Sequence, residues 1–203
     1  MSPGPTFDRI YHALRDRLAE GCYPPGGPLE PAAIGDELHS SITPVRDALH
    51  RLVGEGLVAA PRHDGFRVPS PAEAELRDLY LWNLQLLELA LRRQASAEPS
   101  IDDGSDLGRW AAPEAEVFAR VAAATGSGEH LAAVTRLNDR LAPIRRAERD
   151  VVPSAGSDAE KLAEAETAGD GAALRKLFRL YHRRRVAAVP RIVLASRRPR
   201  PPA

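Results

Sequence analysis

A short polar stretch, Ser41-Ile42-Thr43, followed by Arg46, has the residue types that contact nucleic acid. Hydroxyl groups at the start of a helix can donate to phosphate, and the free N–H groups of the helix end attract anions as well. Arg46, one turn further on, has the planar fork of donors that pairs with both acceptors of a guanine edge. The pattern predicts a helix N-terminus that grips phosphate and reads base edges, with Ile42 offering an apolar contact.

A second group of candidate contacts lies on a predicted turn between two apolar segments, residues 57–61 and 66–69. These segments predict two short strands joined as a hairpin. Glycine in such a turn permits a tight bend and a close approach of the backbone to a ligand. The candidate contacts on this hairpin are Arg62 and His63 at the tip, Gly65 in the turn and Arg67 on the second strand.

Three predicted helices must position these groups. Residues 6–20 carry apolar side chains at three- and four-residue spacing, which is typical of an amphipathic helix, and residues 21–28 form a connecting turn rich in proline and glycine. Pro31 suits the first turn of a short helix that runs to about His39, and a third helix covers Ser41–Leu52. Three helices followed by a hairpin predict a winged helix-turn-helix domain over residues 1–70.

The rest of the chain, residues 71–203, predicts an all-helical bundle after a short hinge at Ser70 and Pro71. The expected fold is therefore mainly α, with two domains and a disordered tail from about residue 196. The predicted helices of this second domain cover about residues 72–97, 112–125, 129–149, 157–168 and 170–194.

Composition limits the class of protein. Hydrophobic residues make up 43% and charged residues 28%, with a formal net charge of zero, as in soluble globular proteins. No apolar run reaches the roughly 18 to 20 residues of a membrane span, so we expect a cytoplasmic protein without membrane contact. The single cysteine, Cys22, excludes an internal disulfide framework. Residues 1–70 carry seven arginines against nine acidic residues, so a nucleic-acid surface would depend on where individual arginines lie.

Residues 6–69 closely resemble, in unbroken order, the DNA-binding domain of the GntR family of bacterial regulators. The resemblance rests on Ile10–Leu18, on Tyr23–Gly26 with Leu29, and on Ser41–Val58. It implies DNA contacts at Ser41, Thr43, Arg46 and Gly65. The family usually has arginine at the position of Ile42, where isoleucine offers only apolar contact, for instance to a thymine methyl group. We therefore expect an operator unlike the family's usual one.

Periodicity alone leaves another interpretation open, because three helices and a hairpin also serve as a packing or protein-interaction module. The second domain resembles, more weakly, the FadR branch of the family, whose helical bundle dimerises and binds a small carboxylate-type effector. That resemblance rests on Leu79-Tyr80, on residues 117–126 and on Ala168–Asp170 before a helix with Phe178. A helix that usually lies between the long helix and the one with Phe118 is shortened or lost.

Many bundles of this branch bind a divalent metal through one aspartate and three histidines. In this chain the four positions fall on Ala115, Ala119, Ala159 and Tyr181, with His182 one residue out of register. We therefore expect no metal and no other cofactor. The arginine that the branch often has in its long helix aligns with Asn83.

Trp82, Asn83 and Gln85 on the long helix are the candidate residues for binding an effector without metal. The alternative is that Trp82 and its leucine neighbours form core or a dimer interface. The leucine content of the bundle favours a homodimer, which would match a roughly palindromic operator on double-stranded DNA.

The expected function is a sequence-specific regulator of transcription, and we expect a repressor, controlled by a small-molecule effector. The alternative is a ligand-blind dimeric DNA-binding protein controlled by abundance or by a protein partner. A helical enzyme is a remote third, because no nucleophile elbow, HExxH motif or phosphate loop brings reactive residues together, and we expect no catalytic residues.

Overall fold

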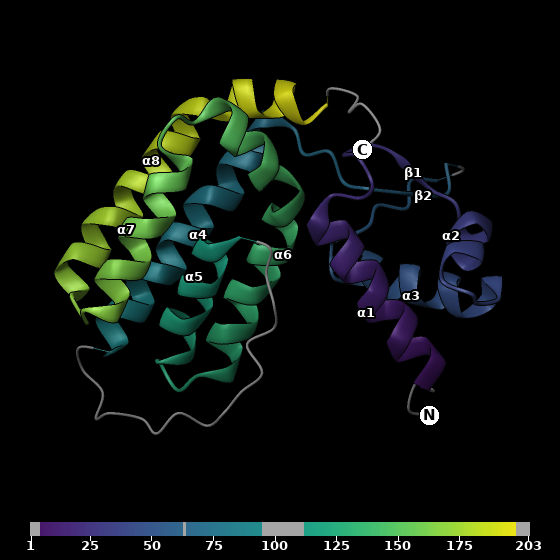
Figure 1. Cartoon of the computed structure of the whole chain (residues 1–203), viewed down its shortest axis with the longest axis horizontal. Coiled ribbons are helices and arrows are strands. Elements are labelled where there is room, and N and C mark those ends of the chain that lie inside the picture. The colour runs from purple at the N-terminus through teal and green to yellow at the C-terminus, as the bar shows by residue number, and fades with distance from the viewer. Residues whose placement is uncertain (1–4, 63, 95–111, 198–203) are drawn as a thin grey trace. The chain divides into compact units, whose positions relative to one another are not determined.

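The computed structural model describes residues 5–62, 64–94 and 112–197, and the chain divides after Ser70 into two compact units (Figure 1). We call the first the N-terminal domain and the second, Pro71–Ala195, the helical domain. None of the helices in the described ranges combines the length and apolar composition needed to cross a bilayer.

The N-terminal domain is built on three helices, which lie close to their predicted positions. They are α1 (Pro5–Glu20), α2 (Pro31–Glu37) and α3 (Ile42–Gly54). The apolar stripe of α1 packs on the buried face of α3, and both faces are excluded from water. The core between them contains Ile10, Leu14, Leu18, Val45, Leu49 and Leu52.

A small sheet completes this domain and corrects two expectations. Strand β1 (Pro28–Leu29) pairs antiparallel with β2 (Phe66–Arg67), although we expected residues 21–28 to be connecting turn only. Proline is tolerated there because the first residue of a short edge strand need not donate to the ladder. The predicted strand over residues 57–61 is reduced to one bridge, Ala59 to Arg67, with both hydrogen bonds at 2.8 Å.

That strand is short because its first residues complete the preceding helix. The N–H groups of Leu57 and Val58 donate to the carbonyl oxygen of Leu52, at 2.9 and 3.3 Å, and so close the C-terminal turn of α3. Pro61, at the other end, has no N–H to donate. Only Ala59 and Ala60 lie between these limits, and Ala59 is the residue that pairs with β2.

Five helices form the helical domain, and the predicted all-helical architecture is confirmed. They are α4 (Glu73–Gln94), α5 (Pro113–Ala123), α6 (Gly128–Val151), α7 (Ala155–Thr167) and α8 (Gly171–Ser196) (Figure 1). Helix α8 continues to Ser196, slightly beyond its predicted end. The expected loss of a helix after α4 concerns residues that lie outside the described ranges, as does most of the expected tail.

Aromatic residues fill the centre of this bundle. The ring of Phe118 on α5 packs edge-to-face with Phe178 at 5.6 Å and with Tyr181 at 5.3 Å, between ring centroids. All three side chains are buried, and they belong to the same core as the buried leucines of α4. The interior is therefore tightly packed where α5 meets α8.

Candidate nucleic-acid interface

The turn between α2 and α3 fixes the start of α3. The N–H of Ser40 donates to the carbonyl oxygen of Gly35 at 2.9 Å, and His39 adopts a left-handed conformation with φ of 49°. Gly35 allows this closure, because a Cβ atom there would lie 2.8 Å from the carbonyl oxygen of Ser40. The two helices are therefore joined by a tight turn that only glycine at position 35 accommodates without movement.

The N-terminus of α3 presents its polar side chains to solvent, as the sequence predicted. Ser41 occupies the N-cap position with extended backbone, but its side chain makes no capping hydrogen bond. Ile42 and Thr43 are exposed in the first turn, and Arg46 is exposed one turn later. Buried residues on the opposite side of α3 hold this face outward.

Most arginines of the N-terminal domain are used within the fold. Arg46 and Arg62 differ, since both are exposed and neither makes a hydrogen bond or ion pair to any residue that the structure describes. Arg15 is not one of these unpaired arginines, because it also makes an interaction. The other internal contacts are Arg9 Nη1 to the Leu38 carbonyl oxygen at 3.0 Å, Arg17 to Glu37, Arg51 Nε to Glu55 Oε1 at 3.2 Å, and Arg67 Nη1 to the Gly26 carbonyl oxygen at 3.2 Å.

Arg51 is an example of an arginine with internal partners. Its guanidinium lies 4.1 Å from the ring centroid of Tyr11, and the Tyr11 hydroxyl donates to Glu55 at 2.8 Å. Burial and then the Glu55 carboxylate raise the pKa of Tyr11 to about 12, so the hydroxyl remains a donor at neutral pH. This cluster ties α1 to the C-terminal end of α3.

The hairpin turn has an exposed arginine and a strained glycine position. Gly65 is exposed with φ of 65°, a left-handed conformation that other residues adopt at a cost. Arg67, expected to reach phosphate, is instead half-buried and donates to the carbonyl oxygen of Gly26, just before β1. His63, the remaining candidate on this hairpin, lies outside the described residues.

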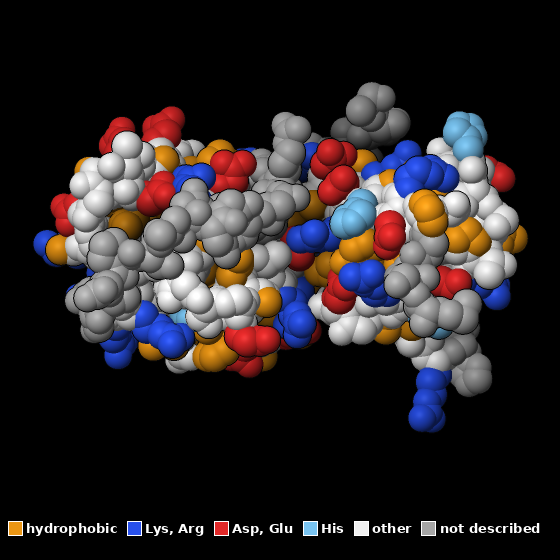
Figure 2. Space-filling model, turned by 90° about the horizontal axis from the view of Figure 1, so that it is seen from below, with side chains coloured by type: hydrophobic (Ala, Val, Ile, Leu, Met, Phe, Trp, Pro, Cys, Tyr) orange, Lys and Arg blue, Asp and Glu red, His pale blue; other side chains and the backbone are white. Residues whose placement is uncertain are grey.

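Charges of both signs are interspersed on the face of the molecule in Figure 2, so arginines and lysines do not gather there into one basic patch. This agrees with the acidic excess of residues 1–70. Binding of a polyanion by the N-terminal domain thus depends on individual groups, the unpaired Arg46 and Arg62 first among them.

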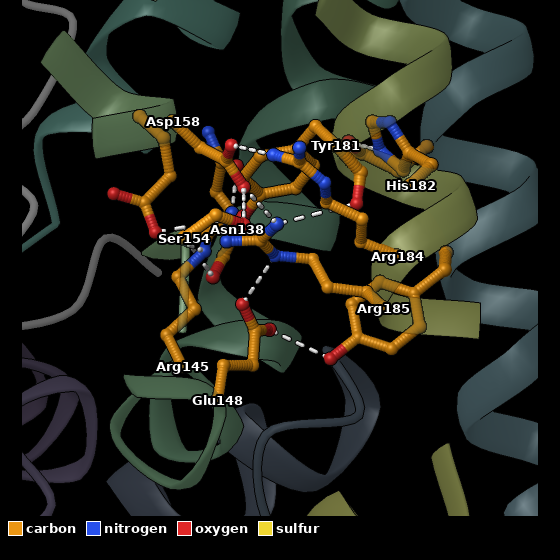
Figure 3. A network of polar contacts seen from close by, with 12 residues as sticks. Asn138, Arg145, Glu148, Ser154, Asp158, Tyr181, His182, Arg184 and Arg185 are labelled. Carbon is orange, nitrogen blue, oxygen red and sulfur yellow. Dashed lines mark hydrogen bonds and ion pairs between the residues drawn. The ribbon is translucent and has the colours of Figure 1, made fainter. Parts of the chain in front are cut away.

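The interior of the helical domain contains a network of buried charges that the sequence did not predict (Figure 3). Arg185 on α8 is fully buried and donates to Glu148 of α6 at 2.6 Å and to Asp158 of α7 at 3.0 Å. The Tyr80 hydroxyl of α4 donates to the other Glu148 oxygen at 2.6 Å. Burial and the Glu148 carboxylate raise the pKa of Tyr80 well above its usual value. Arg185, Glu148, Asp158 and Tyr80 together thus link four helices.

A second buried arginine, Arg145 on α6, extends this network. Its Nη2 donates to Asn138 Oδ1 at 2.8 Å, and Asn138 Nδ2 donates to the carbonyl oxygen of Ala115 at 2.9 Å. The Arg145 Nε lies 3.7 Å from Glu114 Oε1, too far for a good hydrogen bond. Three buried donors, Arg145 Nε, Arg185 Nη2 and Asn83 Nδ2, have no hydrogen-bond partner among the described residues.

The three residues of α4 that were predicted to bind an effector do not point to the same side of the helix. Asn83 is buried and its Oδ1 lies 2.9 Å from His182 Nε2, whereas Trp82 and Gln85 are exposed on the outer side of the helix. The other ring nitrogen of His182 lies 2.7 Å from the Phe178 carbonyl oxygen. Burial lowers the pKa of His182 to about 3, so the ring is neutral at pH 7 and only one nitrogen can donate.

The residues present do not fit the divalent metal site of the FadR branch. Ala115, Ala119 and Ala159 supply no side-chain donor, and Tyr181 keeps its proton because burial raises its pKa. Among the described residues no group of three or more histidine, cysteine or acidic side chains could hold a metal. The Arg185 guanidinium, stacked 3.2 Å from the Tyr181 ring centroid, adds positive charge that would repel a cation.

Three helices with a tight turn before α3, followed by a small sheet with an exposed glycine turn, define a winged helix-turn-helix domain attached to a helical bundle. Residues 6–68 match the profile of the bacterial regulatory proteins of the gntR family. The N-terminal domain is therefore a domain of the gntR family of bacterial regulatory proteins.

Two curated relatives are HTH-type transcriptional regulators. YdhC of Bacillus subtilis is 25% identical over 89 residues, which are 44% of this chain and 40% of that protein. A regulator from the TAR-I ttuE-ttuC' intergenic region of Agrobacterium vitis is 28% identical over 101 residues, 50% of this chain and 59% of that protein. The match therefore spans less than two thirds of either relative.

Two solved structures share the whole fold. McbR/YncC of E. coli has a TM-score of 0.67 at 17% identity, covering 93% of this chain and 98% of that one. A GntR transcriptional regulator from Rhodococcus sp. RHA1 has a TM-score of 0.70 at 20% identity, covering 92% of this chain and 98% of that one. Both domains of this chain therefore have counterparts in one known architecture.

Proposed function

We propose that the protein is a DNA-binding regulator of transcription that acts in the cytoplasm as a homodimer on a roughly palindromic operator. The observation that carries the proposal is the pair of exposed, unpaired arginines on α3 and on the hairpin turn, in a domain whose other described arginines have internal partners. The family matched by residues 6–68 points to regulation rather than catalysis.

In this proposal α3 enters the major groove with its N-terminus towards the bases. Ser41 and Thr43 donate to phosphate or base edges, and Arg46 pairs with guanine. The exposed Ile42 contacts a thymine methyl group, which gives an operator unlike the family's usual one. Arg62 and the backbone at Gly65 contact phosphate from the hairpin.

The test compares two arginine variants by selection of bound sequences from random DNA. Arg46→Ala should cost about 1 to 3 kcal/mol on the selected operator and lose the preference for one base at one position in each half-site. Arg62→Ala should weaken binding to all sequences by a similar factor, because a phosphate contact carries no sequence information. Arg149→Ala, an exposed arginine of the helical domain, is the control and should bind like the unmodified chain.

An unchanged sequence preference in Arg46→Ala would remove that residue from the base-reading set. A loss confined to particular sequences in Arg62→Ala would contradict its assignment to phosphate. Failure of the unmodified chain to enrich any sequence would reject the whole function.

We also propose that a small molecule controls DNA binding from within the helical domain, without metal, and that it releases a repressor. Two buried guanidinium N–H groups without a hydrogen-bond partner among the described residues, Arg145 Nε and Arg185 Nη2, favour a molecule rich in acceptors, such as a small carboxylate. Asn83 is the one candidate residue of α4 that lies in the same interior. Trp82 and Gln85 are not part of this revised site, because they lie on the outer face of α4.

The test measures the melting temperature with a panel of mono- and dicarboxylates. A ligand at 100 times its dissociation constant should stabilise the protein by about 2.7 kcal/mol, which raises the melting temperature by roughly 5 to 10 °C for a chain of this size. Asn83→Leu should abolish the shift. A chain that binds its operator but shifts with no ligand would instead be the ligand-blind DNA-binding protein.

A further inference from the structure

The outer side of α4 exposes three large apolar side chains, two at adjacent positions and one about two turns later. Leu81, Trp82 and Leu89 are 43%, 51% and 44% exposed. In the part of the chain that the structure describes, Ile42 and Leu194 are the other large hydrophobic residues with comparable exposure, and they belong to different helices. Neighbouring apolar residues on one exposed face mark an interaction surface rather than the scatter that is normal for a protein surface.

Leu81 and Leu89 belong to a stripe along α4 with a particular order of charges, and Trp82 lies beside this stripe. Its exposed members, at three- and four-residue spacing, are Asp78, Leu81, Gln85, Leu89 and Arg92. Residues at this spacing share one side of a helix. The order is symmetric about Gln85. Leu81 and Leu89 lie four residues before and after it, and Asp78 and Arg92 lie seven residues before and after it.

We propose that this stripe is the dimer interface, where α4 packs antiparallel against α4 of a second copy across a two-fold axis at Gln85. In that register Leu81 faces Leu89 of the partner subunit, and Asp78 faces Arg92 of the partner subunit. The proposal rests on the homodimer of the proposed function and assigns the surface and register that form it.

Charge complementarity selects the antiparallel arrangement. A parallel pair in register would place Asp78 against its own copy and Arg92 against its own copy, and like charges in contact are destabilising. The antiparallel pair makes two ion pairs instead, related by the two-fold axis, as an isologous interface requires. Arg92 Nη2 also lies 3.6 Å from Glu88 Oε2 of its own helix. Arg92 can keep this ion pair at the edge of the proposed interface.

The first experiment is cross-linking in a Cys22→Ser background, which removes the exposed native thiol. Gln85→Cys places a thiol on the proposed axis, so mild oxidation should join most of the protein into a disulfide-linked dimer. Glu73→Cys is the matched control, because Glu73 is exposed on the same helix but away from the stripe, and it should cross-link little.

The second experiment measures the dimer dissociation constant by sedimentation. The double variant Leu81→Gln, Leu89→Gln should weaken the dimer about a hundredfold, because four partly buried leucines are lost per dimer. Leu194→Gln, an exposed leucine on α8, should not change it. Unchanged circular dichroism would show that the variants remain folded.

A charge exchange tests the register. Asp78→Arg alone and Arg92→Asp alone should each weaken the dimer, roughly tenfold or less for exposed pairs, and the combination should restore it. A combination that is weaker than either single variant would overturn the antiparallel register.

The outcomes separate this interface from the proposed function. A dimer that binds its operator but survives the leucine substitutions, with no Gln85→Cys cross-link, would overturn the α4 interface and leave the DNA-binding function intact. A chain that is monomeric at all concentrations would overturn both the interface and the homodimer. Formation of the α4 dimer without selection of any DNA sequence would support the interface and reject the regulator.

Discussion

Arginine has opposite environments in the two domains. Arg46 lies in solvent at the start of a helix, where its charge is free for a ligand, whereas Arg185 is buried with two carboxylates already in contact. Removing one member of a buried pair leaves an uncompensated charge, which is far more costly than removing an exposed arginine. The same residue type is therefore accessible to a ligand in one domain and bound within the fold in the other.

His182 gives the helical domain a specific dependence on pH. Its pKa falls from 6.5 to about 3 because of burial first, with the nearby positive charges of Arg185 and Arg145 adding to the effect. The unfolded chain takes up this proton near pH 6.5, whereas the folded chain does not until about pH 3. Stability is therefore full above pH 6.5 and falls as the pH drops towards 3, by up to about 1.4 kcal/mol per pH unit from this one group.

We expect His182→Gln to flatten that part of the stability curve, whatever its effect on absolute stability. Urea unfolding at pH 7, 6 and 5 provides the measurement. If the variant and the unmodified chain lose stability in parallel over this range, the neutral, buried state of His182 is wrong.

At the scale of elements, the turn between α2 and α3 is the most sensitive part of the N-terminal domain. Gly35→Ala would bring a Cβ atom to 2.8 Å from the carbonyl oxygen of Ser40, so the turn must open. We expect a loss of about 1 to 3 kcal/mol in stability and weaker operator binding, because α3 is displaced. Thermal unfolding and DNA titration measure the two effects.

The control for this variant is Gly54→Ala at the end of α3, where an added Cβ meets nothing. Alanine should stabilise a helix there by roughly 0.5 to 1 kcal/mol relative to glycine. If Gly35→Ala were as stable as Gly54→Ala, the close contact at Ser40 would not constrain the turn.

The sequence predicted the helices well because each one repeats its apolar residues over several turns. It did not predict β1, since two residues carry no periodicity and Pro28 argues against a strand unless a partner is known. It predicted too long a strand after α3, because the bonds from Leu57 and Val58 to Leu52 compete with strand pairing and leave no pattern in the residues.

The spacing of residues on α8 contained an indication of the buried charges, but the neighbouring arginines obscured it. Arg185 follows Phe178 and Tyr181 on the same apolar face of α8, where a charged residue indicates a buried pair. Its position in the run of arginines 183–185 made a solvated face the simpler interpretation. By contrast, the hydroxyls and arginine at the start of α3 could be predicted as an exposed group, because the buried positions of that helix were clear from spacing alone.

At the scale of the whole molecule, the helical domain holds itself together with arginine–carboxylate contacts, and the positions of the branch's metal ligands are occupied by Ala115, Ala119, Ala159 and Tyr181. We expect treatment with EDTA to leave both the melting temperature and operator affinity unchanged. Stoichiometric zinc, nickel or manganese in the purified protein, by elemental analysis, would contradict this expectation.

The exposed thiol of Cys22, between α1 and β1, offers a practical consequence. Because each chain has one cysteine, a single fluorophore per chain would give the proposed homodimer one pair of dyes, fixed to its two N-terminal domains. Energy transfer between the dyes would then follow the separation of those domains in solution. Labelling at Cys22 would thus allow the proposed operator binding, and the proposed release by a ligand, to be followed by fluorescence.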